Sequence, residues 1–276
     1  MKQTPDKESR KQPLLPLEQT QLRTRDLMRL LDGELLALRI SPFITPKTCR
    51  EWANILENSS ALGRYSNADD VPVNRIGMTL FETEHQPDKL EAYLRMAQSC
   101  VSLIDQILGQ RGNPLSAIQE SLDKIWTSGC QVEQLSGRPM NPGIIRTFEA
   151  ASNGGLPPHT DTLLKDLPDC HSYAGMGAQL AANLYLNVPQ NGGELEIWDY
   201  EPTEAELPSL YNGTYDFIDR TKLPSQPLVL QPQTGELILF RSSCVHSVRA
   251  ASGGMRTAAS CFVGYYGVDR PLTVWA

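Results

Sequence analysis

The sequence predicts an α+β fold in which a helical N-terminal half packs on an antiparallel β-sandwich or jelly roll. The period of its hydrophobic pattern changes near residue 140. Before this point apolar residues recur at intervals of three to five residues, as in helices, and after it they alternate, as in strands. Many short strands with polar turns between them favour a sandwich over a parallel α/β sheet.

The first half contains four helical patterns and one short strand. Leucines recur over 17–31, and Gly33 can end that helix. The segment "LLALRIS" at 35–41 is typical of a strand. In the next helix Thr45 is the expected N-cap and Pro46 the first helical residue. The last two helices are expected at 87–109 and 113–129.

The second half contains seven strand patterns separated by turns such as "NGG", "QTG" and "SGG". Residues 201–226 interrupt them with a long segment, which is either a lid over a site or an inert surface loop. The strands are expected at 143–150, 183–188, 193–200, 227–232, 235–240, 244–250 and 256–266.

Length and composition bound the class of protein. The chain has 276 residues and a net charge of −7, which makes a nucleic-acid partner unlikely on charge grounds. It contains no apolar run of about 18 residues, so no membrane span is expected, and a cytoplasmic location is predicted. Residues 1–16 are expected to be a disordered tail. Residues 17–276 are expected to form one domain, with 17–139 as mainly helical support and 140–276 as the β core.

The stretch "LPPHTDTLL" places His159 and Asp161 one residue apart. On a strand, alternate residues point to the same face, so the pair can present an imidazole and a carboxylate to one cation. The alternative is a turn in which the histidine bonds a carboxylate. His246 in a later strand is the natural third ligand. Two imidazoles and one carboxylate form the facial triad of non-haem Fe(II) sites, which leaves coordination positions open.

Arg256 follows ten residues after His246 and opens the next strand. A hairpin turning at "ASGGM" would direct both side chains into the same barrel. An arginine deep in such a site can bind a carboxylate through two hydrogen bonds. A surface ion pair is the alternative role.

With these residues in place, "HTD", "NLYLNVPQNGGELEIWD" and "TGELILFRSSCVHSVRAASGGMRTAASCFVGYY" resemble the Fe(II)- and 2-oxoglutarate-dependent oxygenase superfamily, in particular its prolyl-hydroxylase-like branch. The resemblance covers roughly residues 140–266 and implies a double-stranded β-helix of the jelly-roll or cupin kind. It implies that His159, Asp161 and His246 bind iron and that Arg256 binds the distal carboxylate of 2-oxoglutarate. Fe(II), 2-oxoglutarate and O2 are therefore the expected cofactors and co-substrates.

The chain is also similar to the small group around the hapalindole and welwitindolinone halogenases, with two departures. Iron halogenases have a small residue in place of the triad carboxylate, whereas this chain has Asp161, which favours hydroxylation. Many members of the superfamily have Arg-x-Ser where this chain has Arg256 and Ala258, so one contact to the co-substrate is expected to be missing.

Further site residues are expected on the inward faces of the strands. Tyr185 and Asn183 can reach 2-oxoglutarate, although Tyr185 is equally compatible with a plain core position. Arg146 can reach the co-substrate or an anionic group of the substrate, or lie solvated at an edge. Trp198 and Phe240 are expected in the core.

Three functions remain open from the sequence. The first is a hydroxylase of a small molecule such as a natural-product intermediate, an amino acid or a nucleoside-like compound, with succinate and CO2 as co-products. Desaturation or cyclisation on the same scaffold is a variant of it. The second is a prolyl-type hydroxylase of protein residues. The third is a zinc-binding or non-catalytic cupin-like module, which would not require Arg256. The sequence does not indicate the oligomeric state.

Overall fold

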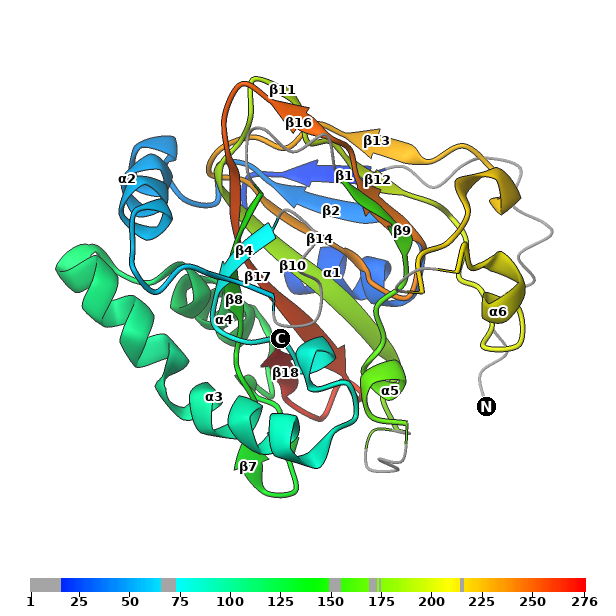
Figure 1. Ribbon diagram of the computed structural model, residues 1–276, viewed down its shortest axis with the longest axis horizontal. Coiled ribbons are helices and arrows are strands. Elements are labelled where there is room, and N and C mark those ends of the chain that lie inside the picture. The colour runs from blue at the N-terminus through cyan, green and yellow to red at the C-terminus, as the bar shows by residue number, and fades with distance from the viewer. Residues whose placement is uncertain (1–15, 66–72, 149–154, 169–172, 174, 214–215) are drawn as a thin grey trace.

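A large mixed sheet forms the centre of the molecule (Figure 1). The computed structural model describes residues 16–65, 73–148, 155–168, 173, 175–213 and 216–276; the expected disordered tail lies outside them except for Pro16. The strand order is β1-β2-β14-β10-β17-β8-β4-β3, and β18 lies between β17 and β5. The strands are β1 Pro16–Gln19, β2 Ala37–Ile40, β3 Gly63–Arg64, β4 Val73–Ile76, β5 Cys130–Val132, β8 Ile144–Phe148, β10 Ala178–Asn187, β14 Leu237–Arg241, β17 Arg256–Tyr265 and β18 Leu272–Trp275.

A second sheet of four short strands has the order β13-β12-β15-β9. Its strands are β9 Leu156–His159, β12 Leu195–Ile197, β13 Leu228–Leu230 and β15 His246–Val248. Two further strand pairs are β6 Gln134–Leu135 with β7 Arg138–Pro139, and β11 Asn191–Gly192 with β16 Ala251–Ser252. The two larger sheets form the predicted double-stranded β-helix.

The helices are α1 Thr24–Leu31, α2 Pro46–Glu57, α3 Pro87–Leu108, α4 Pro114–Ile125, α5 Leu163–Asp166 and α6 Leu207–Leu210, with 3-10 turns η2 Leu80–Thr83, η3 Gly109–Arg111 and η5 Arg220–Lys222. The predicted N-cap of α2 is confirmed, because the Thr45 hydroxyl accepts a hydrogen bond from the Thr48 amide at 3.2 Å. Within the described residues, none of the helices is long and apolar enough to cross a bilayer.

The helix expected from residue 17 begins only at Thr24, and that prediction was wrong for 17–22. Residues Pro16–Gln19 instead form β1, which pairs in parallel with β2. Leu17 and Leu22 pack against the main core from outside a helix. The leucine spacing reports burial correctly, but spacing alone does not distinguish a helix from an edge strand followed by a turn.

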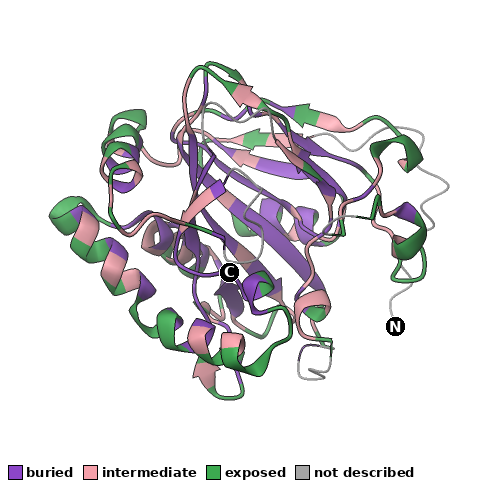
Figure 2. Cartoon of the chain, in the orientation of Figure 1, coloured by how far each residue is buried: buried purple, intermediate pink, exposed green. Residues whose placement is uncertain are grey.

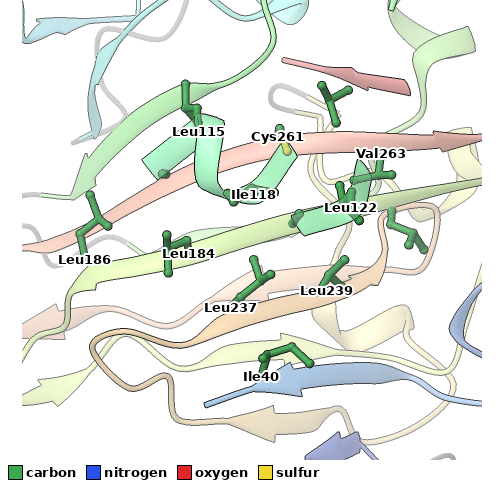
Figure 3. Packing of buried hydrophobic residues seen from close by; sticks show 14 of the residues in the cluster. Ile40, Leu115, Ile118, Leu122, Leu184, Leu186, Leu237, Leu239, Cys261 and Val263 are labelled. Carbon is green, nitrogen blue, oxygen red and sulfur yellow. The ribbon is translucent and has the colours of Figure 1, made fainter. Parts of the chain in front are cut away.

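Strand β10 shows how the sequence divides the interior into two layers. Leu180, Leu184 and other even-numbered residues of β10 contact the main core beneath the helices. Figure 3 shows this layer, in which the β10 residues Leu184 and Leu186 and the α4 residues Ile118 and Leu122 belong to one cluster. The odd-numbered residue Tyr185 belongs to the second core, between the two sheets. The strict alternation of a strand therefore directs one set of side chains to structural packing and the other to the space between the sheets.

Burial follows the same arrangement (Figure 2). The central strands are buried along most of their length, whereas α3 is buried on one face and exposed on the other. Among the described cysteines, Cys49, Cys100, Cys244 and Cys261 are buried and free, and Cys130 is partly buried and free. The scattered cysteines, which form no C-x-x-C pair in the sequence, are therefore unpaired thiols at these five positions, and Cys170 lies outside the described residues.

Candidate metal centre and co-substrate chamber

His159 and His246 are direct partners across two antiparallel strands. β9 ends at His159, β15 begins at His246, and the two residues are in register. Their ring centroids are 4.3 Å apart. The prediction that remote segments bring these two histidines together is therefore confirmed.

Both rings are oriented by the backbone. The Nδ1 atom of His159 is 2.7 Å from the Pro157 carbonyl oxygen, and the Nδ1 atom of His246 is 2.9 Å from the Cys244 carbonyl oxygen. A carbonyl can only accept, so each Nδ1 carries the proton and each Nε2 is left with a lone pair. The Nε2 atoms are 3.7 Å and 3.4 Å from the Asp161 Oδ2 atom.

Asp161 lies beyond the end of β9, and the expectation that it shares a strand face with His159 was wrong in this detail. Instead, hydrogen bonds to Ser242 and Gln179 hold the backbone amide and the backbone carbonyl of Asp161. The Asp161 amide donates to the Ser242 carbonyl at 2.9 Å, and the Ser242 hydroxyl and the Gln179 amide donate to the Asp161 carbonyl at 3.0 Å and 3.2 Å. The side-chain oxygen of Gln179, Oε1, in turn accepts a hydrogen bond from the Leu163 backbone amide at 2.8 Å. Nothing in the sequence pattern indicated Gln179 or Ser242.

The electrostatics of the cluster suit a cation. Burial, followed by the neighbouring His246, lowers the pKa of His159 to about 4, so its imidazole is neutral at ordinary pH. Burial opposes ionisation of Asp161, but His159 and His246 outweigh it and hold the pKa of that carboxyl well below its usual value. One ligand atom from each of the three residues lies within 4.8 Å of the others. Two neutral imidazoles and one carboxylate can bind a divalent metal ion on one face.

Arg256 is a buried guanidinium without a carboxylate partner among the described residues. It lies over the rings of Phe148 and Tyr185, and its guanidinium carbon, Cζ, is 5.0 Å and 4.9 Å from their respective centroids. It donates one hydrogen bond, to the Tyr185 hydroxyl, at 3.2 Å. Its Nε atom is buried without any hydrogen-bond partner within the described part of the chain. Such a group has unused donors for an anion.

The predicted hairpin between His246 and Arg256 is not present. β15 belongs to the small sheet and β17 to the large one, and β16 between them pairs with β11. The chain therefore crosses from one sheet to the other at "ASGG". Both side chains still line one space, because β15 and β17 face each other across it.

This space is an inner chamber of about 50 Å³ whose wall includes the histidine–aspartate cluster and Arg256. Asn183 lines it, as expected, and accepts a hydrogen bond from the Ser260 hydroxyl at 2.7 Å. Ala258 is buried in the core between the sheets. Ser260, two residues after Ala258 on β17, thus contributes a hydroxyl to the wall of the chamber.

An outer chamber of about 130 Å³ adjoins the cluster. His159 and Asp161 line both chambers, and so does Arg146 from β8. Phe217, from the long 201–226 segment, lies against His159 with ring centroids 6.2 Å apart. That segment therefore contributes to the wall of the outer chamber, which is one of the two roles left open for it.

The remaining predicted residues fall outside the cluster. Of the two other histidines in the sequence, His85 is exposed and His171 lies outside the described residues, as does Tyr215 of the 201–226 segment. Trp198 is buried, and its indole nitrogen donates to the Ser225 carbonyl at 3.0 Å. Phe240 is also buried, and its ring lies 4.9 Å from the His246 ring in an edge-on contact. Phe240 thus belongs to the core and also supports a cluster histidine.

Known proteins resemble this chain in sequence. A sequence model of the 2OG-Fe(II) oxygenase superfamily matches residues 145–264. L-gamma-glutamyl-L-propargylglycine hydroxylase of Streptantibioticus cattleyicolor is 27% identical over 173 residues, which are 61% of this chain and 61% of that protein. L-isoleucine 3(1)-dioxygenase of Pantoea ananatis is 27% identical over 124 residues, 44% of this chain and 42% of that protein. The chain thus spans less than two thirds of the length of these curated relatives.

A solved structure shares the fold. The crystal structure of an N-substituted L-amino acid dioxygenase of Burkholderia ambifaria, in complex with alpha-KG, superposes on this chain with a TM-score of 0.57 and 16% sequence identity. The superposition covers 91% of this chain and 90% of that chain. The superfamily match includes all of the residues that form the cluster and Arg256. Residues 145–264 of the chain therefore resemble the 2OG-Fe(II) oxygenase superfamily, and the solved structure shows the same fold.

Proposed function

We propose that the protein is an Fe(II)- and 2-oxoglutarate-dependent dioxygenase that hydroxylates an unactivated C–H bond of a small molecule of the amino-acid class. In this reaction one oxygen atom of O2 enters the substrate, and the other enters succinate as 2-oxoglutarate loses CO2. The observation that carries the proposal is the buried Arg256, whose Nε has no hydrogen-bond partner among the described residues and which lines the same chamber as the histidine–aspartate cluster.

The metal ligands in this proposal are His159, Asp161 and His246. Their fit to Fe(II) rests on the donor set: two imidazoles with free Nε2 lone pairs and an ionised carboxylate, whose ligand atoms lie within 4.8 Å of one another. When bound, Fe(II) would supply the activation of O2 that amino-acid side chains cannot provide. The chain supplies the orientation of the ligands, through the backbone carbonyls at Nδ1 and through Gln179 and Ser242 at Asp161.

The proposed co-substrate residues are Arg256, Tyr185 and Asn183. Arg146 lines both chambers, so it can face either the co-substrate or the substrate. A buried cation costs free energy unless an anion or dipole offsets it. Arg256 has only the Tyr185 hydroxyl and the two ring faces, and burial lowers its pKa. A carboxylate with two acceptor oxygens would remove this cost. 2-Oxoglutarate has such a group at the end distant from its metal-chelating keto acid, so it can span the chamber.

The amino-acid class of substrate is supported by what the relatives are named to act on and by the outer chamber. One relative is named for an L-gamma-glutamyl dipeptide and the other for L-isoleucine. The outer chamber is bounded by Phe217 of the 201–226 segment, which favours a small molecule over a side chain presented on a protein surface. The retained Asp161 favours hydroxylation over halogenation, because it occupies the metal position that a halide would need.

The test is product formation with defined requirements. The purified protein is supplied with Fe(II), O2 and 2-oxoglutarate, and succinate is measured with and without a panel of L-amino acids and gamma-glutamyl dipeptides. We expect succinate formation that needs all three components, rises with one class of substrate, and accompanies a product heavier by one oxygen atom. Succinate formation that is absent in every combination would refute the proposal.

A further inference from the structure

The outer chamber has a largely apolar lining, together with charged residues of both signs. Its apolar lining comes from several separate segments, including β4, β8 and the 201–226 segment. It includes Val73, Leu80, Phe81, Phe148, Leu156 and Phe217. Apart from the metal cluster, the charged residues of the lining are Arg146, Lys165 and Asp166. Whether each of these charges is already neutralised by the protein decides what the chamber can bind.

Arg146 forms no ion pair within the described residues. It lies on β8, opposite Arg75 of β4. Arg75 forms an ion pair with the fully buried Glu82. The charge of Arg146 and its hydrogen bond to the Tyr65 side chain oppose the rise that burial causes in the pKa of Tyr65. The Nε atom of Arg146 is buried and has no hydrogen-bond partner in the described structure.

Asp166 provides the opposite charge. It is the last residue of α5, and no cation within the described residues forms an ion pair with it. Its neighbour Lys165 is directed elsewhere: the Lys165 amine is 3.3 Å from an Asp216 carboxylate oxygen and lies over the Tyr211 ring. Burial, followed by the charge of Asp161, raises the pKa of Asp166 to about 7. A cation in the chamber would stabilise the ionised form of this carboxyl.

We propose that the outer chamber binds a free L-amino acid with an apolar side chain as its zwitterion, with the carboxylate on Arg146 and the ammonium group on Asp166. This inference rests on the proposed function and specifies its substrate. A zwitterion offsets both charges of the wall at once. A dicarboxylate would leave Asp166 without a partner, and a simple amine would leave Arg146 without one. The apolar lining then surrounds the side chain.

The position of the metal cluster agrees with this orientation. His159 and Asp161 line the same chamber as Arg146 and Asp166. The field of Arg146 reaches both cluster residues, since it contributes to the lowered pKa values of His159 and Asp161. An amino acid held at its two charged groups therefore places its side chain, and not its backbone, as the part free to approach the metal. Oxidation is expected on the side chain.

The experiment compares matched ligands in matched variants. The probes are L-valine, L-leucine, L-isoleucine, L-methionine and L-phenylalanine, each with its deaminated acid, its decarboxylated amine and its N-acetyl derivative. Binding is measured anaerobically to the Fe(II)–2-oxoglutarate protein through the change in its visible charge-transfer band. The variants are Asp166→Asn and Arg146→Gln. The controls, Asp88→Asn and Arg95→Gln, make the same chemical changes at exposed positions on α3.

For wild type and both controls, we expect one or more free amino acids to bind at least about 10-fold more tightly than their three analogues, as expected for a charge-assisted hydrogen bond. Asp166→Asn should weaken the amino acid by about 10- to 100-fold and leave the deaminated acid unchanged, so the two become similar. Arg146→Gln should weaken binding of the amino acid by a similar factor and leave binding of its decarboxylated amine unchanged, so that these two ligands become similar.

Three results would overturn the inference. The first is equal binding of an amino acid and its deaminated or N-acetyl form to the wild type. The second is an intact charge-transfer band with no binding of any free amino acid of the panel. The third is a loss of 2-oxoglutarate affinity in Arg146→Gln that equals the loss in Arg256→Gln, because Arg146 would then serve the co-substrate. A charge-transfer band absent from the wild type would instead contradict the proposed function itself.

Discussion

His159 and His246 face each other across a single register position of β9 and β15, although 86 residues separate them in the sequence. Each ring is fixed through Nδ1 by the carbonyl oxygen two residues before it. The two Nε2 atoms consequently point toward Asp161 without any side chain having to orient them. A preformed arrangement of this kind lowers the cost of ordering the ligands when a metal ion binds.

The first prediction concerns Arg256. Arg256→Gln should weaken 2-oxoglutarate by about 10- to 100-fold, since a charge-assisted contact contributes about 1.5–3 kcal/mol. Metal affinity should be unchanged, because Arg256 supplies none of the three candidate ligand atoms. Anaerobic calorimetric titration of 2-oxoglutarate into the Fe(II)-loaded protein measures this directly. Equal 2-oxoglutarate affinity in wild type and variant would exclude Arg256 as the carboxylate site.

Tyr185→Phe provides a graded companion. It removes the hydroxyl that accepts the Arg256 hydrogen bond but keeps the ring on which the guanidinium lies. A neutral hydrogen bond contributes about 0.5–1.5 kcal/mol, so a loss of 2-oxoglutarate affinity of about 10-fold or less is expected in the same titration. A loss as large as that of Arg256→Gln would show that the hydroxyl, and not the guanidinium, is the main contact.

Asp161 is predicted to be a required ligand. Asp161→Gly removes one of three ligands and its negative charge, and hydroxylation of substrate should be lost. Product mass spectrometry in the presence of chloride also shows whether a halogenated product appears, which depends on how the substrate is placed as well as on the open metal position. The control Asp269→Gly changes an exposed aspartate and should retain full activity. Full hydroxylation by the Asp161 variant would refute the assignment.

Gln179 is predicted to support the metal site without touching the metal. Its amide holds the Asp161 carbonyl and the Leu163 amide, on both sides of the ligand-bearing turn. Gln179→Ala should reduce metal affinity by about 10- to 100-fold, the usual effect of losing such a supporting contact. Anaerobic Fe(II) titration measures it, with the exposed Gln131→Ala as the control. Unchanged affinity would mean that Ser242 alone fixes Asp161.

Glu196 is predicted to make the stability of the folded state depend on pH. Burial disfavours its charge, but Arg220, Ser247 and Arg249 outweigh burial and lower its pKa from 4.5 to about 2. A carboxyl with a lowered pKa stabilises the folded state above pH 4.5, and this stabilisation is lost as the pH falls toward 2. The contribution near neutral pH is about 3.5 kcal/mol at most, because one pKa unit corresponds to about 1.4 kcal/mol.

Glu196→Gln should therefore unfold more readily near neutral pH and show a shallower loss of stability between pH 4.5 and 2. Chemical denaturation at several pH values measures both effects, and the exposed Glu204→Gln is the control. Because Arg220 connects Glu196 to the segment that carries Phe217, the variant should also be cut faster by protease in 201–226. A pH profile identical to that of wild type would refute the stabilising role of this ion pair.

The sequence predicted those parts of the site that depend on residue type and strand alternation. His159, His246 and Arg256 line one chamber as expected, and Asn183 and Tyr185 share the inward face of β10. Alternation is a local property, so it can be read without knowing which strands pair.

The sequence could not predict contacts that depend on how distant segments cross. Gln179 and Ser242 support Asp161 only because the start of β10 and the turn after β14 meet there. The passage from β15 to β17 looks like a hairpin in sequence, yet the two strands join different sheets. Arg146 and Asp166 likewise line one chamber through tertiary structure alone.

The measurement that tests the central claim most directly is the anaerobic absorption spectrum of the protein with Fe(II) and 2-oxoglutarate. A metal-bound keto acid at the histidine–aspartate cluster predicts a weak visible charge-transfer band in the wild type. The band should saturate with 2-oxoglutarate, require higher concentrations in Arg256→Ala, and disappear in His246→Ala. Absence of the band from wild-type protein, or a band that neither substitution alters, would contradict the assignment of this chamber as the Fe(II) and 2-oxoglutarate site.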